Sequence, residues 1–278
     1  MKKTLAIILA LVLALTAFAA CGKPSTPSDV DVPELPSSET SIPDFDSDYV
    51  KSNGKLVVGI TDFEPMDYKD ENGEWIGFDA DMAKAFAEEL GIDVEFVEID
   101  WDNKLLELNS KKIDCVWNGM TLTDEVISSM ECSEPYCNNA QVVIVAADKA
   151  EQYNTVEACK ELNFAVESGS AGQEQAEANG FKFTEVQNQA AALMEVAAGT
   201  CDAAIIDSLM AAAMVGEGTG YEQLTYTVGL NEEKYGVGFR TGSDLAESLN
   251  NFFTKSFNDG TLMKIAEKYG VQAAIIEK

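Results

Sequence analysis

The chain has 278 residues and a formal net charge of −29, from 48 acidic and 19 basic side chains, and it contains no histidine. Nucleic-acid-binding surfaces are basic, so this charge argues against a nucleic-acid partner. Without histidine, the commonest general base and the commonest metal ligand are both missing, and we expect neither a metal nor a cofactor.

The first 20 residues have the pattern of a secretory signal peptide. Lys2 and Lys3 precede an apolar segment over residues 5–15, which is too short to span a membrane as a helix. The sequence FAAC that follows resembles the lipobox of bacterial lipoproteins, which implies that Cys21 is the mature N-terminus and carries acyl chains such as palmitate. Ordinary cleavage beside a chance cysteine is the alternative. No other segment reaches the roughly 20 apolar residues of a transmembrane helix, so a lipid would be the only anchor.

Residues 21–50 have the composition of a disordered tether. All but two of the 7 prolines fall here, among Ser, Thr and Asp. A segment of this composition cannot bury enough apolar surface to fold. The remaining chain is long enough for two lobes with separate cores. We expect lobe 1 to comprise residues 51–145 and 240–278, and lobe 2 to comprise residues 146–239.

Strands and helices alternate in the first predicted lobe. The β-branched run at 55–60 predicts a strand, and an apolar face over 81–90 predicts a helix. Residues 92–99, 103–110 and 113–117 then predict a strand, a short amphipathic helix and a buried strand. This alternation predicts an α/β fold.

Polar residues follow a buried strand in each predicted lobe. Asn118, Gly119 and Thr121 come after the strand at 113–117, and Asp207 ends a similar apolar run in lobe 2. Ligands of open α/β sheets gather beyond the carboxyl ends of the strands. We therefore expect a small molecule to meet these residues, with hydroxyl and backbone groups on one lobe and a carboxylate on the other.

Two extended runs, 141–146 and 235–239, are the predicted hinge crossings between the lobes. The helical patterns at 245–257 and 261–269 then return to pack on lobe 1.

Five cysteines follow Cys21, with no CxxC or metal-ligand spacing. Cys115 and Cys201 lie in apolar runs and are predicted core thiols. A disulfide between Cys132 and Cys137 stays open, because it depends on an oxidising environment outside the cell.

The motifs VVGITDFEPMDYKDENGEWIGFDADMAKAFAEELG, EIDWDNKLLELNSKKIDCVWNGMTLT, FAVESGSAG, GTCDAAIIDS and YGVGFRTGSDL occur in this order. As a set they resemble the extracellular solute-binding proteins of ABC importers for polar amino acids, known as family 3. The resemblance covers residues 55–271. It implies a two-lobed, periplasmic-binding-protein-like (type II) α/β clamp with two hinge crossings, which closes on its ligand.

The resemblance also implies roles for single residues. Phe63 and Trp101 match the two aromatic walls of the family's ligand site. Gly119 matches a backbone contact to the α-amino group, and Thr121 matches a hydroxyl that contacts the amino acid. Asp207 matches the carboxylate that pairs with the ammonium, a charge-assisted contact that desolvation strengthens.

The second lobe is expected to hold the α-carboxylate. Ser170 and Ala171 fall where a loop and a helix N-terminus meet this group in the family, and free N–H groups there bind anions. Glu167 stands where a residue that selects the ligand side chain often lies, and it favours a polar or cationic group. A solvated surface glutamate is the alternative.

One position departs from the family. Members usually carry an arginine where this chain has Val126, and valine cannot replace a bidentate guanidinium. Either the carboxylate is held by backbone N–H groups and another residue, with Asn118, Asn139 and Arg240 as candidates, or the ligand is not an ordinary α-amino acid.

Structural roles compete with the ligand roles. Phe63 and Trp101 are alternatively core aromatics, and Gly119 with Thr121 alternatively forms a simple turn. Asp207 is alternatively the cap of the helix that follows it.

The function we expect is that of a lipid-anchored monomeric receptor on the extracellular face of the cytoplasmic membrane, which is periplasmic where an outer membrane exists. It captures a polar amino acid and delivers it to an ABC permease, and ligand contacts to both lobes drive closure. One alternative is an enzyme on the same fold, similar to periplasmic dehydratases, with Glu64, Asp67 or Glu167 as acid or base. Another is a sensing module that a partner protein reads.

Overall fold

The computed structural model describes residues 45–278. The signal peptide, Cys21 and most of the predicted tether lie outside these residues. Helix α1, Asp46–Asn53, begins inside the segment predicted as tether. It is held in place because Val50 is buried, Ser47 donates to the Asp244 carboxylate, and the first residue of the helix pairs with Arg240.

The first sheet is mixed and has the order β4-β1-β5-β13-β6, with β7 also paired to β13. Strands β4 and β5 run parallel to β1, whereas β13 runs antiparallel to β5. The bounds of its strands are β1 Lys55–Ile60, β4 Asp93–Glu98, β5 Cys115–Thr121, β6 Glu131–Cys132, β7 Cys137–Asn139 and β13 Glu233–Phe239.

The second sheet is also mixed, with the order β10-β9-β11-β8-β12. Strands β10 and β11 are parallel to β9, and β8 is antiparallel to both β11 and β12. A third, two-stranded sheet pairs β2 with β3. The bounds of these strands are β2 Tyr68–Lys69, β3 Trp75–Ile76, β8 Gln141–Ala146, β9 Asn163–Glu167, β10 Lys182–Val186, β11 Ala203–Asp207 and β12 Leu224–Gly229.

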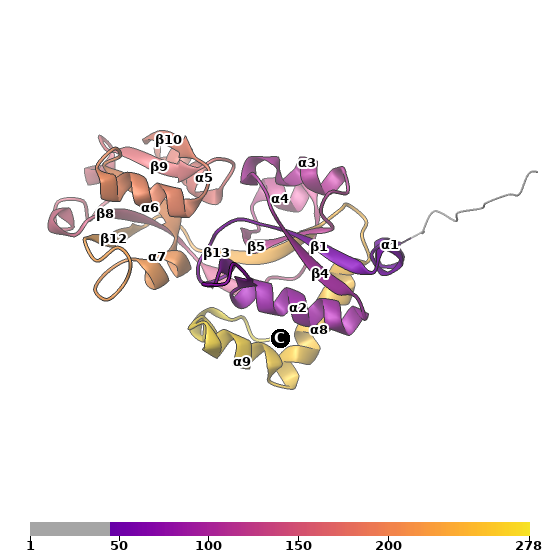
Figure 1. Ribbon diagram of the computed structural model, residues 1–278. Helices are drawn as coiled ribbons and strands as arrows, with labels where there is room; N and C mark the ends of the chain where they lie inside the picture. Colours follow the sequence, from indigo (N-terminus) through magenta and orange to yellow (C-terminus); the bar gives the residue numbers. More distant parts are fainter. Residues whose placement is uncertain (1–44) are drawn as a thin grey trace, which may run out of the picture. The chain divides into compact units, whose positions relative to one another are not determined.

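Helices cover the faces of both sheets (Figure 1). Helices α2 and α8 lie against one face of the first sheet, and α9 packs on these two helices. Helices α3 and α4 lie on the other side of this sheet, and α5 and α6 pack on the second sheet. The bounds of the helices after α1 are α2 Phe78–Leu90, α3 Lys104–Asn109, α4 Asp124–Ser129, α5 Ala171–Asn179, α6 Gln189–Ala198, α7 Ser208–Met214, α8 Leu245–Asn258 and α9 Thr261–Lys268.

An aromatic core joins α2 and α8 to the first sheet. Phe86 of α2 lies against Trp117 of β5 and Phe252 of α8, and Trp117 meets Phe253 edge-on with ring centroids 5.7 Å apart. These side chains are buried because the helices present apolar residues at spacings of three and four. Trp117 is therefore a core residue, consistent with the buried strand predicted at 113–117.

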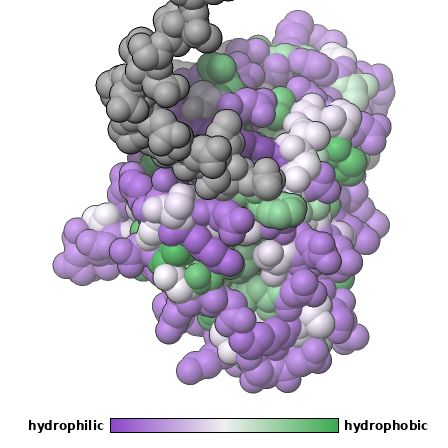
Figure 2. Space-filling model, turned by 90° about the vertical axis from the view of Figure 1, so that its right-hand side faces the viewer, coloured by the Kyte–Doolittle hydropathy of each residue, from purple (hydrophilic) through white to green (hydrophobic). Residues whose placement is uncertain are grey.

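Figure 2 shows one face on which hydrophilic residues predominate and apolar residues are scattered among them. Within residues 45–278, no helix combines the length and the apolar character that crossing a membrane requires.

The chain passes between the two large sheets twice. The first passage is at Ala140, between β7 and β8, and the second is at 230–232, between β12 and β13. Both runs predicted as hinge crossings are strands, but each lies within one sheet, and the passages precede them. Strand β13 pairs with β5 of the first sheet, although the sequence assigned these residues to lobe 2.

Strand β5 continues further than the sequence predicts. Residues Asn118 to Thr121 were expected in a turn after the strand, yet they form its last four positions. The reason is long-range pairing, because Tyr235 and Gly236 of β13 lie opposite Thr121 and Met120. The residues nevertheless lie at the carboxyl end of the strand, where ligands of such sheets are bound.

Candidate functional site

A pocket lies where the strand ends of both large sheets meet. Its volume is about 560 Å³, counting the opening to solvent. Every residue that the sequence predicts for the ligand site lines it, namely Phe63, Trp101, Asn118, Gly119, Thr121, Glu167, Ser170, Ala171 and Asp207. The lining thus combines residues that are far apart in the sequence.

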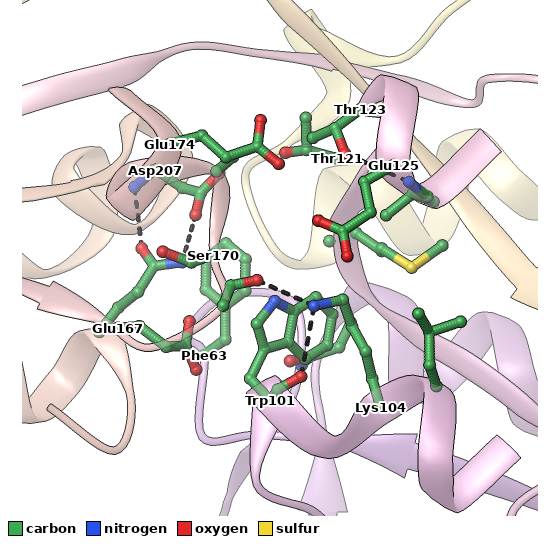
Figure 3. Close-up of a pocket in the computed structure, with 18 residues that line it drawn as sticks. Phe63, Trp101, Lys104, Thr121, Thr123, Glu125, Glu167, Ser170, Glu174 and Asp207 are labelled. Carbon is green, nitrogen blue, oxygen red and sulfur yellow. Dashed lines mark hydrogen bonds between the residues drawn. The ribbon is translucent and has the colours of Figure 1, made fainter. Parts of the chain in front are cut away.

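Two aromatic side chains form walls of the pocket (Figure 3). Phe63 follows β1, is 2% exposed, and meets Tyr235 edge-on with ring centroids 6.3 Å apart. Trp101 begins the short 3-10 helix Trp101–Asn103 and is 8% exposed. Both rings are packed on one side and line the cavity on the other.

The side-chain amide of Asn118 is hydrogen-bonded within the protein. Its amide oxygen accepts from the backbone N–H of Thr61, and its nitrogen donates to the Asp67 carboxylate at 2.8 Å. The amide therefore fixes the end of β1 against β5. This arrangement gives Asn118 a structural role beneath the ligand space.

Gly119 allows a close approach of the backbone to the aromatic wall. Its φ is +53°, and a Cβ at this position would lie 2.5 Å from Phe63 Cε1. Its N–H donates to Asp79 at 2.6 Å, which leaves the Gly119 carbonyl as its possible contact to a ligand. Burial raises the pKa of Asp79 to about 7, although the Gly119 and Tyr136 hydrogen bonds lower it.

Asp207 ends β11 and is 4% exposed. Burial raises its pKa well above the ordinary value, and the negative charge of Glu233 raises it further. The carboxylate accepts hydrogen bonds from four side chains, Asn139, Gln141, Gln189 and Tyr235.

The Asp207 side chain does not cap the helix that follows it. Asp207 precedes α7, but its carboxylate makes no capping hydrogen bond to that helix. The carboxylate instead lines the pocket. It is therefore placed to meet a ligand.

Thr121 is tied to Glu233 at the junction of the sheets. Its hydroxyl donates to Glu233 Oε1 at 2.8 Å. The same oxygen accepts from Asn139 Nδ2 at 2.6 Å and Gln141 Nε2 at 2.8 Å. The hydroxyl oxygen of Thr121 keeps its capacity to accept a hydrogen bond, whereas its proton is already engaged.

The N-terminus of α5 opens onto the pocket. Ser170 is its N-cap, and the Ser170 hydroxyl oxygen accepts from the Gln173 N–H at 3.2 Å. Ala171 is the first helical residue, and N–H groups in a first turn have no acceptor within the helix. Such groups, together with the helix dipole, attract an anion.

The sequence reasoning missed Lys104, which is the only basic residue of the lining within residues 45–278. Its ammonium donates to Gly169 O at 2.8 Å and to Trp101 O at 3.3 Å, and it lies 5.2 Å from the centre of the Trp101 ring (Figure 3). Burial lowers its pKa, while Glu125 and Glu167 raise it. The sequence did contain a sign of its role, because Lys104 lies only three residues after Trp101, in the first turn of α3.

The three candidates for the missing arginine do not bring a charge to the pocket. Val126 does line it, at the position where family members carry arginine. Arg240 is held elsewhere by Asp46 and Asp114, and the Asn139 amide is engaged by Asp207.

Glu167 is a buried carboxylate of the lining. It is 3% exposed, and its Oε1 has no hydrogen-bond partner among residues 45–278. Burial raises its pKa to about 8, although the charge of Lys104 and the side chains of Gln189 and Thr61 lower it. The competing interpretation as a solvated surface residue is therefore wrong.

Two further acidic side chains were not expected. Glu125 of α4 and Glu174 of α5 line the pocket from two different helices (Figure 3). Both are exposed at its opening.

The described residues show no cluster of three or more His, Cys, Asp or Glu side chains that could hold a metal ion. The five cysteines in this part of the chain are free thiols, so Cys132 and Cys137 are not bridged.

Residues 56–272 match the sequence model of the bacterial extracellular solute-binding proteins, family 3. The chain belongs to this family. It is 27% identical over 224 residues to the L-cystine-binding protein TcyJ of Escherichia coli (strain K12), covering 79% of this chain and 84% of that protein.

Solved structures agree with the family's fold. The ancestral amino acid-binding protein AncCDT-1, a precursor of cyclohexadienyl dehydratase, has a TM-score of 0.74 and 33% identity, covering 80% of this chain and 98% of that chain. An ABC uptake transporter substrate-binding protein from Streptococcus pneumoniae with bound histidine has a TM-score of 0.74 and 29% identity, covering 82% of this chain and 97% of that chain. These likenesses confirm the predicted two-lobed α/β fold. The relatives are binding proteins, which supports a binding function over an enzymatic one.

Proposed function

We propose that this member of the family captures an amino acid between its two lobes and delivers it to an ABC permease. The observation that carries the proposal is the convergence on one pocket of all nine residues that the sequence predicts for the ligand site, eight of which match the family's motifs. The names of the relatives support it, since they bind cystine or histidine, and one belongs to an uptake transporter.

The charges of the pocket suggest how the amino acid is oriented. Its ammonium pairs with the Asp207 carboxylate and donates to the Gly119 carbonyl. Its carboxylate faces the N-terminus of α5 at Ser170 and Ala171, where N–H groups point outward. The walls, including Trp101, exclude water and strengthen these contacts.

Lys104 supplies the positive charge that Val126 cannot. An ammonium has three N–H donors, and two of those of Lys104 are used by the Gly169 and Trp101 carbonyls. The third is free to meet the ligand carboxylate. The Gly169 bond also reaches from α3 of the first lobe to the loop before α5 of the second.

We also propose that the protein is anchored by lipid at Cys21 on the extracellular face of the membrane. The sequence FAAC ahead of the tether supports this proposal. Substitution Cys21→Ala is expected to move the protein from the membrane fraction to the supernatant, and unchanged membrane association of this variant would contradict it.

Thermal unfolding of the purified full chain in the presence of single amino acids tests the binding function. A ligand at 100 times its Kd stabilises the folded state by about 2.7 kcal/mol. Asp207→Asn removes the charge with little change in shape and is expected to abolish most of the shift. Failure of every amino acid to raise the midpoint would refute the proposal.

A further inference from the structure

Glu167 differs from the other buried carboxylate of the pocket in its hydrogen bonding. Asp207 accepts from four side chains. Glu167 is equally buried, yet its Oε1 has no partner in the described part of the chain. A buried polar atom without a partner is costly, and native proteins retain one mainly where it serves a function.

The surroundings of Glu167 do not supply its missing partner. The nearest basic side chain, Lys104 of α3, turns its ammonium to two backbone carbonyls and forms no ion pair with Glu167. The other charged groups of the lining are acidic, namely Glu125 of α4, Glu174 of α5 and Asp207 of β11. Acidic side chains of the lining thus outnumber the single ammonium, and two of them, Glu125 and Glu174, are exposed.

A ligand with a second positive charge fits this arrangement. The ammonium of any amino acid satisfies one carboxylate, which leaves Glu167 Oε1 buried without a partner in the described part of the chain. A guanidinium or a side-chain ammonium would pair with Glu167 in a desolvated setting, where charge-assisted hydrogen bonds are strongest. The carboxylates of Glu125 and Glu174 at the opening would attract the same ligand by their field.

We infer that the pocket selects amino acids with a cationic side chain, and that Glu167 is the residue that binds the side-chain cation. This inference rests on the proposed capture of an amino acid. It adds the ligand class and assigns to Glu167 a role separate from that of Asp207.

Calorimetric titration of the purified full chain at pH 8 tests this inference. The probes are arginine, lysine and ornithine against citrulline, which carries a neutral urea in place of the guanidinium, and glutamine. Arginine is expected to bind at least about 30-fold more tightly than citrulline, since a hydrogen bond between charged groups in a desolvated site contributes about 2 kcal/mol. Glu167→Gln should remove most of that ratio by weakening arginine binding.

Two variants serve as controls. Glu177→Gln removes a charge from an exposed position of the same helix that bears Glu174, outside the pocket, and should leave the ratio unchanged. Glu167→Asp keeps the charge and should keep a preference for arginine. If Glu167→Gln does not fold, the ratio of the affinities for arginine and citrulline in the unmodified protein still tests the preference for a cationic side chain.

The outcomes separate the two proposals. Equal affinities for arginine and citrulline, or a preference that survives Glu167→Gln, would overturn the inference while leaving amino-acid capture intact. Tight binding of the diamines cadaverine and putrescine without any amino-acid binding would overturn both, because neither ligand carries a carboxylate.

Discussion

The pH dependence of ligand binding follows from the burial of Glu167. Its pKa is about 8 in the free pocket, so a cation that binds the carboxylate must first displace a proton at lower pH. Each pH unit below the pKa costs about 1.4 kcal/mol. About half of the carboxyls are ionised at pH 8 and about 1% at pH 6, so arginine should bind about 50-fold more weakly at pH 6.

Titration calorimetry at several pH values between 6 and 8 measures this change directly. Buffers of different ionisation enthalpy also count the protons released, and about nine-tenths of a proton should come from Glu167 at pH 7. Asp207, whose pKa is also raised, adds a release of its own that is common to every amino acid. The difference between arginine and citrulline therefore isolates Glu167.

Two results would refute this reasoning. One is an affinity ratio of arginine to citrulline that stays constant from pH 6 to pH 8. The other is the same pH dependence of that ratio in Glu167→Gln, since the amide has no proton to release in this range.

Three further predictions concern stability and closure. The folded-state pKa of Glu167 exceeds its ordinary value of 4.5, so the ligand-free protein binds more protons when it is folded than when it is unfolded. As the pH rises from 4.5 to 8, the folded state should therefore lose up to about 1.4 kcal/mol of stability per pH unit. Urea unfolding of Glu167→Gln should show a weaker dependence of stability on pH. Gly119→Ala should destabilise by about 1–3 kcal/mol because of its positive φ and the contact with Phe63, and an unchanged urea midpoint would contradict this. Lys104→Met removes the bond to Gly169 O and should raise the ligand dissociation rate about tenfold in stopped-flow experiments; an unchanged rate would exclude a role in closure.

Local patterns were sufficient for most elements and for the choice of site residues. The run at 55–60 forms β1 with the predicted bounds, and the helical pattern at 245–257 matches α8 within one residue. The site residues were found because each lies at or after the carboxyl end of a strand or begins a helix, and such ends converge in an α/β fold. Ordered motifs of the family then assigned a role to each of them except Asn118.

Contacts between distant segments account for what the sequence could not predict. Strand β5 extends to Thr121 only because β13 pairs with it. Arg240, a candidate for the ligand carboxylate, is instead 9% exposed and bound to Asp46 and Asp114. Its first partner belongs to α1, the segment whose composition resembled a tether. No local pattern shows that such a segment will dock.

The hydrogen bonds around Asp207 indicate how ligand binding is coupled to the junction between the lobes. Asp207 ends a strand of the second sheet, and Tyr235 of the first sheet donates to its carboxylate at 2.8 Å. Glu233 lies beside it, raises its pKa, and also accepts from Thr121 of the first sheet. Two carboxylates held this close repel each other when both are ionised. A ligand ammonium that neutralises Asp207 relieves this repulsion where the chain passes between the sheets, whereas a neutral molecule of the same size does not. Charge on the ligand should therefore stabilise the closed arrangement as well as the contact itself.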